Sequence, residues 1–293
     1  MITASDGVKL HVRSVGSGPP LVFAHEFSGD ARSWNRQVGF FSRYFRCTTY
    51  CARGYPPSEV PLGVDAYSQN RAAEDLADVV HASADEPAHV VGLSMGGFAA
   101  LHFGIKYPEL TRSLVIAGVG YGAKPEQQSE HGNAMRREAD HAEEIGMAAF
   151  ACELASSSYA HRLRAKDEIG WQCFREQLAE HSVTGMAMTL RGILAARPSL
   201  WHVTDALRAL TKPALLIIGD EDAPCIEPNL FLKNALPDAA LCVLPRCGHL
   251  VNLEDPALFN NVVFGFLLAV ERGAWAAWKP ASAQAISSGG GVR

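Results

Sequence analysis

The chain has 293 residues, of which 48% are hydrophobic and 19% charged, so it is long enough to bury a large globular core. Its formal net charge of −5 disfavours a nucleic-acid partner, which would need a basic face. No apolar run is long enough to span a bilayer, and we recognise no signal peptide, so we expect no membrane association. The seven cysteines are then expected as reduced thiols of a cytoplasmic protein.

Strands and helices alternate in the first part of the chain. Strands are predicted at 8–13, 21–24, 46–50, 88–91 and 113–117, and helices at 34–45, at 67–84 and after residue 94. Continuous apolar runs such as 21–24 are typical of strands buried on both faces of a parallel sheet. This alternation predicts an α/β fold with a doubly wound, mostly parallel sheet.

The alternation stops after Gly122. The next segment, residues 123–205, carries helical patterns and no clear strand, which indicates an inserted helical subdomain. Strands resume at 214–218 and 240–244, and a helix closes the pattern at 256–270. We therefore expect four parts, at residues 1–122 (first part of the core), 123–205 (helical cap), 206–273 (second part of the core) and 274–293 (flexible tail).

One serine stands at a sharp turn between a predicted strand and a predicted helix. Residues 92–97 read Gly-Leu-Ser-Met-Gly-Gly, with Ser94 at the apex. Such a turn holds the serine in a strained conformation with its hydroxyl exposed above the sheet edge. Gly92 and Gly96 leave room for the close crossing of strand and helix.

A serine hydroxyl needs a base within hydrogen-bond reach and an acid to orient that base. The ends of two late strands supply both residue types, with Asp220, Glu221 and Asp222 after one strand and His249 after the next. Functional groups of parallel sheets gather at the carboxyl ends of the strands, where Ser94 also lies. From position alone, each of the three acids remains a candidate.

The chain resembles the α/β-hydrolase superfamily in five features that occur in the expected order. They are the Ser94 turn, the segment beginning at His25, Arg53-Gly54, the turn from Gly219 to Asp222, and Gly248-His249. The resemblance covers residues 5–122 and 206–271, with the helical insertion in the place of a cap.

This resemblance implies a role for each site residue. Ser94 would be the nucleophile, His249 the general base and acid, and Asp222 the orienting carboxylate, because the family places this acid three residues after the glycine. The backbone N–H groups of Phe27 and Met95 would form the oxyanion hole.

Glu26 departs from the family pattern, which has glycine after the histidine. A carboxylate pointing inward would oppose the negative charge that develops in the oxyanion hole. We expect Glu26 to point away and to bond a neighbouring loop, with Arg53 as a candidate partner.

Candidate substrate-pocket residues are Glu26 and four apolar residues of the insertion, namely Trp171, Phe174, Met186 and Met188. Helix-core packing explains these four equally well. The histidines of residues 123–205 lack the spacing of a helical metal site, so no metal is expected.

The leading function hypothesis is a serine hydrolase that cleaves a small carboxylic ester or lactone through an acyl-enzyme on Ser94, without metal or organic cofactor. A C–C bond hydrolase, a perhydrolase or a cofactor-free oxygenase could use the same residues. A non-catalytic ligand receptor on this fold is the third alternative. The identity of the small-molecule substrate depends on the shape of the insertion, and the sequence predicts neither it nor the oligomeric state.

Overall fold

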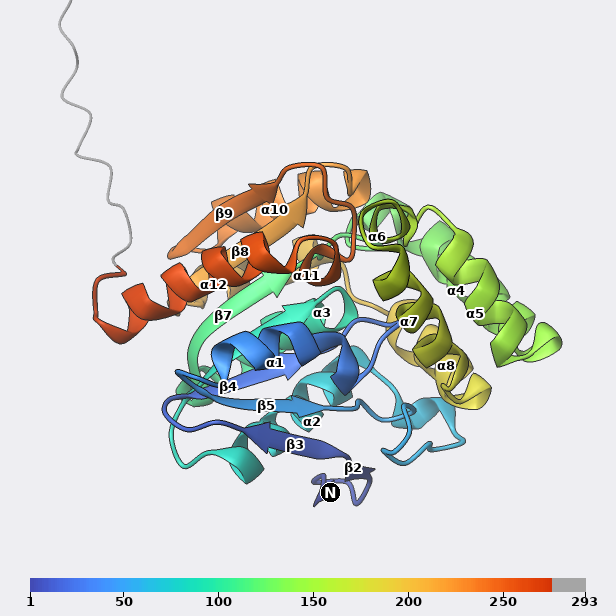
Figure 1. The fold of residues 1–293 in the computed structure, drawn as a ribbon, viewed down its shortest axis with the longest axis horizontal. Coiled ribbons are helices and arrows are strands. Elements are labelled where there is room, and N and C mark those ends of the chain that lie inside the picture. Colours follow the sequence, from blue (N-terminus) through green and yellow to red (C-terminus); the bar gives the residue numbers. More distant parts are fainter. Residues whose placement is uncertain (276–293) are drawn as a thin grey trace, which may run out of the picture.

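The computed structural model describes residues 1–275, which build a seven-stranded sheet with helices on both faces (Figure 1). The strand order is β3-β5-β4-β6-β7-β8-β9, and only the β3-β5 pair is antiparallel. The strands of this sheet are β3 (Val12–Val15), β4 (Pro20–Ala24), β5 (Arg46–Tyr50), β6 (Ala88–Leu93), β7 (Thr111–Ala117), β8 (Ala214–Gly219) and β9 (Ala239–Leu244). The predicted doubly wound α/β fold is confirmed.

Twelve α-helices occur among the described residues. They are α1 (Asn35–Phe41), α2 (Gln69–Ser83), α3 (Met95–Lys106), α4 (Gln128–Ile145), α5 (Met147–Ser156), α6 (His161–Lys166), α7 (Glu168–Ala179), α8 (Val183–Thr189), α9 (Thr204–Ala209), α10 (Ala223–Ala235), α11 (Val251–Glu254) and α12 (Pro256–Glu271). Helices α1 and α12 contact each other on one face of the sheet, and α2 and α3 contact each other on the other face (Figure 1).

Two hydrophobic clusters hold these layers together, one on each face of the sheet. The cluster beside α1 and α12 contains Phe41 and Phe259, and the cluster beside α2 and α3 contains Leu76 and Phe103; all four are fully buried. Every residue of β4, β6 and β8 is also buried, as their apolar runs predict. Burial of each large apolar side chain contributes about 1.5–3 kcal/mol.

The strand register brings several strand ends to one edge of the sheet. Ala24 pairs with Gly92, and Leu93 pairs with Ala117, so β4, β6 and β7 end side by side. Strand β8 continues this edge and ends at Gly219. The loops that leave this edge carry the candidate site residues.

Two predicted elements differ from the structure in extent. The strand predicted at 8–13 is interrupted at His11, because its first part, β2 (Lys9–Leu10), pairs with β1 (Ile2–Thr3) in a separate two-stranded sheet. The helix predicted at 34–45 ends at Phe41, after which the backbone N–H of Phe45 still bonds the carbonyl of Phe41 at 2.9 Å in a closing turn.

The segment predicted as the helical insertion, residues 123–205, contains helices and no strand, and its last residues already belong to α9 (Figure 1). It leaves the sheet after β7 and returns to it at β8. Within residues 1–275 no helix is both long and apolar enough to cross a bilayer. The flexible tail predicted at 274–293 lies outside the described residues from position 276 onward.

Candidate active site

Ser94 occupies a strained turn between β6 and α3. Its φ of 53° and ψ of −113° lie in a region that side-chain-bearing residues rarely adopt. Its backbone N–H donates a 2.8 Å hydrogen bond to the carbonyl of Ala117 in β7, which fixes the turn to the sheet. Its neighbours Leu93 and Met95 are buried, whereas Ser94 is only half-buried. The turn therefore leaves the hydroxyl of Ser94 accessible while the residues on either side are buried.

Glycine is required on both sides of this turn. A Cβ atom on Gly92 would lie 2.1 Å from the carbonyl oxygen of Gly96. A Cβ on Gly96 would lie 2.1 Å from the carbonyl oxygen of Ala24 in β4. Since both neighbours are backbone atoms that cannot rotate away, strand and helix cross this closely only with glycine at the two positions.

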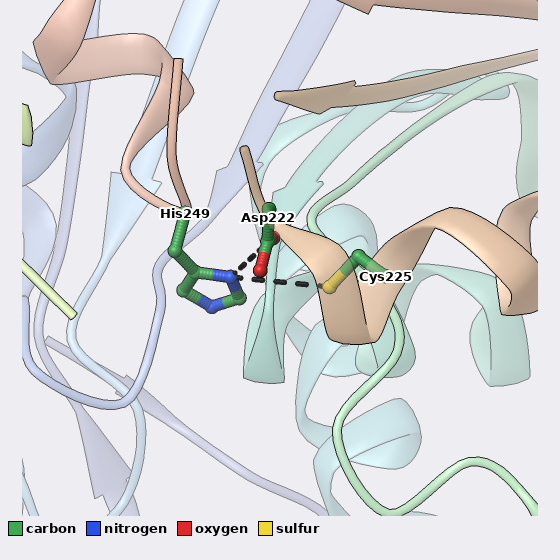
Figure 2. A group of neighbouring side chains, drawn as sticks. All are labelled: Asp222, Cys225 and His249. Carbon is green, nitrogen blue, oxygen red and sulfur yellow. Dashed lines mark hydrogen bonds and ion pairs between the residues drawn. The ribbon is translucent and has the colours of Figure 1, made fainter. Parts of the chain in front are cut away.

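His249 and Asp222 meet at the same sheet edge, from the loops after β9 and β8 (Figure 2). Nδ1 of His249 lies 2.7 Å from Oδ2 of Asp222, and both side chains are buried. Burial raises the pKa of Asp222, but the hydrogen bond and electrostatic attraction of His249 outweigh it, so the net pKa lies below its ordinary value. Asp222 therefore stays ionised and fixes the orientation of the imidazole.

The other two acids of this loop lie elsewhere. Asp220 accepts a 3.2 Å hydrogen bond from the backbone N–H of Cys247, and Glu221 pairs with Arg162. Among the three candidates, the structure brings Asp222 to His249.

Cys225 is the third buried side chain of this group (Figure 2). Its Sγ lies 4.0 Å from Nδ1 of His249. The donor atoms of Asp222, Cys225 and His249 are close enough to surround a metal ion. Burial raises the pKa of this thiol well above its ordinary value. Asp222 and His249 already pair with each other directly, at 2.7 Å.

Ser94 and His249 line one cavity of about 250 Å³. The other residues lining it are Phe27, Tyr121, His131, Met135, Glu138, Leu154, Tyr159, Leu190, Leu194 and Arg197. No hydrogen bond joins Ser94 to His249 in the described part of the chain. Catalytic hydrogen bonds of unliganded enzymes are often long and tighten when substrate binds.

Two aromatic rings hold the imidazole of His249. The rings of Tyr121 and Tyr159 both have their centroids 5.1 Å from that of His249. The hydroxyl of Tyr159 is fixed by a 2.8 Å hydrogen bond with Ser28. A Cβ on Gly118 would lie 3.4 Å from Cε1 of His249, so this glycine leaves the ring its space.

Of the two predicted oxyanion-hole residues, Met95 follows Ser94 directly in the chain and Phe27 lines the same cavity as Ser94. Met95 is the first residue of α3, so its N–H has no acceptor within the helix. The hydroxyl of Tyr55 donates a 2.8 Å hydrogen bond to the carbonyl of Phe27. The His25 ring anchors the same loop, since its Nδ1 bonds the carbonyl of Glu26 at 2.7 Å and its Nε2 accepts from the N–H of Ala52 at 2.9 Å.

Glu26 is fully buried and is not among the residues that line the cavity. Its Oε1 accepts a 2.9 Å hydrogen bond from Ser33, and its Oε2 has no partner. The expected partner Arg53 is wrong, because Arg53 is paired with Asp75 at 2.6 Å. Burial raises the pKa of Glu26 to about 7, which the bond from Ser33 only partly offsets.

The four apolar residues proposed for the pocket lie away from it. Trp171 is buried and donates a 2.7 Å hydrogen bond to the carbonyl of Ala155, where α7 packs against α5. Phe174 lines a different cavity, while Met186 and Met188 belong to the packed core. The structure therefore does not place these four residues in the pocket. The helices of the insertion bury their apolar faces against one another instead.

The insertion lines the cavity instead with residues from α4, from α5 and the loop after it, and from the segment 190–197. His131, Met135 and Glu138 have i, i+4, i+7 spacing and therefore share one face of α4. That spacing could have been found in the sequence. Arg197 follows α8 in an irregular segment and carried no such signal.

Comparison with known proteins identifies the family. The profile of the alpha/beta hydrolase family matches residues 21–262, which is more than half of the chain. The chain therefore belongs to the alpha/beta hydrolase family, and it is a hydrolase. The resemblance seen in the sequence is confirmed.

Its relatives include enzymes of several kinds. A Bacillus subtilis protein, provisionally named as a 2-succinyl-6-hydroxy-2,4-cyclohexadiene-1-carboxylate synthase, is 28% identical over 92% of this chain and 98% of its own length. The 3-oxoadipate enol-lactonase 1 of Acinetobacter baylyi is 27% identical over 92% and 97%. A solved structure of a thermophilic esterase from Thermogutta terrifontis has a TM-score of 0.80 and 26% identity, covering 92% of this chain and 97% of that one.

Proposed function

We propose that this chain is a serine hydrolase that cleaves a small carboxylic ester or lactone through an acyl-enzyme on Ser94. The observation that carries the proposal is the cavity in which the strained, accessible Ser94 meets His249, itself held by Asp222 at 2.7 Å. The relatives named as an enol-lactonase and as an esterase support the same reaction class.

In this proposal the two nitrogens of His249 have separate tasks. Nδ1–H donates to the Asp222 carboxylate, so Nε2 carries the free lone pair. Nε2 takes the proton of Ser94 as Oγ bonds the substrate carbonyl carbon, and the carbonyl electrons move to its oxygen. When the tetrahedral intermediate collapses, the bond to the alcohol breaks and Nε2 returns the proton to that alcohol.

The acyl-enzyme is then cleared by water. Nε2 of His249 removes a proton from the water as its oxygen bonds the acyl carbon, and Ser94 leaves with that proton. In both steps, formation and hydrolysis of the acyl-enzyme, the N–H groups of Phe27 and Met95 donate hydrogen bonds to the negatively charged carbonyl oxygen. Each such donor contributes about 10²–10³-fold to the rate of acyl transfer.

We further propose that the helical insertion acts as a cap that sets the substrate. Its residues supply much of the cavity lining, from His131 on α4 to Arg197. A cavity of about 250 Å³ is smaller than the roughly 300–1,000 Å³ of pockets for drug-sized ligands, which favours a small substrate.

The test compares substrates of the competing reactions. We expect turnover of short 4-nitrophenyl esters or of simple lactones, and its loss in Ser94→Ala. Faster turnover of a β-diketone would assign the chain to C–C bond hydrolysis, and dependence on peroxide would assign it to perhydrolysis. Tight ligand binding without any turnover would favour the receptor hypothesis.

A further inference from the structure

Arg197 is a buried cation at the candidate active site. Its side chain lines the same cavity as Ser94 and His249, although the residue is only 6% exposed. Nη1 donates a 2.8 Å hydrogen bond to the carbonyl of Tyr121, and Nε has no partner. No carboxylate among residues 1–275 forms an ion pair with it.

The guanidinium group is held firmly in place. Its Cζ lies 3.7 Å from the ring centroid of Phe98, which follows Ser94 by four residues and so lies about one helical turn along α3. The carbonyl of Arg197 accepts a 2.8 Å hydrogen bond from Gln128. Two residues on, Ser199 donates a 2.7 Å hydrogen bond to the carbonyl of Ala123. These contacts fix a positive charge against Phe98, in the cavity that Ser94 also lines.

Three titratable groups that interact electrostatically with Arg197, namely His102, His131 and Cys225, are neutral at pH 7. Burial, followed by the charge of Arg197, lowers the pKa of both His102 and His131 to about 4. Burial keeps the thiol of Cys225 protonated. Glu138 also lines the cavity, from α4, but it forms no ion pair with Arg197.

The other buried arginine of residues 1–275 shows how this chain places such a charge elsewhere. Arg53 is 1% exposed and lies 2.6 Å from Asp75 and 2.8 Å from Asp6. A buried charge without a partner is strongly unfavourable, so buried charges are normally paired. Arg197 lacks such a partner, and it lines a cavity in which a ligand could supply one.

We propose that Arg197 binds a carboxylate of the substrate. The preferred substrate is then a small ester or lactone that carries a free carboxylate in addition to its scissile carbonyl group. This inference rests on the proposed function of Ser94. The planar guanidinium fork matches a carboxylate, and hydrogen bonds between two charged groups are stronger than those between neutral groups.

The test compares anionic and neutral esters of equal length. The anionic substrates are the mono-4-nitrophenyl esters of succinate, glutarate and adipate, and their methyl-capped diesters are the neutral partners. Each kcat/KM is divided by the spontaneous hydrolysis rate, because the free carboxylate also promotes that reaction. We expect at least one chain length to favour the anionic ester by about 10-fold or more.

Two variants locate this preference. In Arg197→Gln the anionic-to-neutral ratio should fall by roughly 10–100-fold, and Arg197→Lys should restore part of it. Arg191→Gln is the matched control, since Arg191 lies in the same insertion but pairs with Asp140 and Glu143 outside the cavity. Its ratio should equal that of the wild type.

Three results would overturn the inference. They are a wild type that prefers the neutral ester at all three lengths, an unchanged ratio in Arg197→Gln, and an equal fall in Arg191→Gln. If Arg197→Gln does not fold, the anionic-to-neutral ratios of the wild type at the three chain lengths still test the inference. If the wild type hydrolyses neither these esters nor simple lactones, the proposed function fails. Calorimetric binding of succinate, glutarate and adipate against their diamides then tests the Arg197 site by itself.

Discussion

Asp222 and His249 lie 27 positions apart in the chain, yet Oδ2 of the acid and Nδ1 of the imidazole are separated by 2.7 Å. Strands β8 and β9 pair in parallel and end together at Gly219 and Leu244, so the loops after them meet at one edge. The rings of Tyr121 and Tyr159 then fix the plane of the imidazole. The sheet register thus determines which nitrogen of His249 faces the cavity.

Asp222→Asn should lower kcat by about 10³–10⁴-fold while leaving the fold intact, because an amide that donates to Nδ1 places the proton on Nε2 and removes the base. Hydrolysis of a 4-nitrophenyl ester measures this. Asp220→Asn is the control, since its side-chain oxygen can still accept from Cys247, and it should lose less than about 10-fold. The reverse ranking of the two variants would contradict the assignment of the acid.

Gly92→Ala should destabilise the protein by about 1–3 kcal/mol or more, because its Cβ would lie 2.1 Å from the carbonyl oxygen of Gly96. Gly39→Ala is the matched control. A Cβ at position 39 of α1 meets nothing within 4 Å, so this change should stabilise by about 0.4–1 kcal/mol. Urea unfolding measures both, and equal effects of the two substitutions would refute the close crossing at the turn.

Glu26 should make the stability of the protein depend on pH. Burial raises its pKa from 4.5 to about 7 in the folded state, so between these values the folded chain binds more protons than the unfolded chain. Stability therefore falls as the pH rises through this window, by about 3 kcal/mol in total. Glu26→Gln keeps an acceptor for Ser33 but cannot ionise.

The comparison that isolates this effect is urea unfolding of wild type and Glu26→Gln at pH 4 to 8. The variant should gain about 3 kcal/mol relative to the wild type between the two ends of the range. Parallel stability profiles would show that Glu26 ionises normally in the folded protein.

The sequence allowed the core of the site to be predicted because its parts are local. Ser94, Asp222 and His249 each stand in a short motif at a strand end, and a parallel sheet brings strand ends together whatever the loops do. The alternation of apolar strands with helices predicted the sheet for the same reason. The identity of the orienting acid followed from the family pattern.

The cavity lining could not be predicted in this way, because it depends on contacts between distant segments. Trp171 and Phe174 have large apolar side chains of the kind that line pockets, but they lie where α7 packs against its neighbours. Arg197 carries no periodic signal, and only the folded chain places its guanidinium over the ring of Phe98. The partner of Glu26 likewise depended on how the loop from residue 26 to Ser33 closes on itself.

The most direct test of the central claim is labelling with a fluorophosphonate, which reacts with an activated serine. Mass spectrometry of the digested protein should find a single adduct on Ser94, formed rapidly in the wild type and absent in Ser94→Ala. Labelling should slow strongly in Asp222→Asn, because His249 would no longer accept the serine proton. A wild type that stays unlabelled, or that is labelled at another residue, would contradict the assignment of Ser94 as the nucleophile.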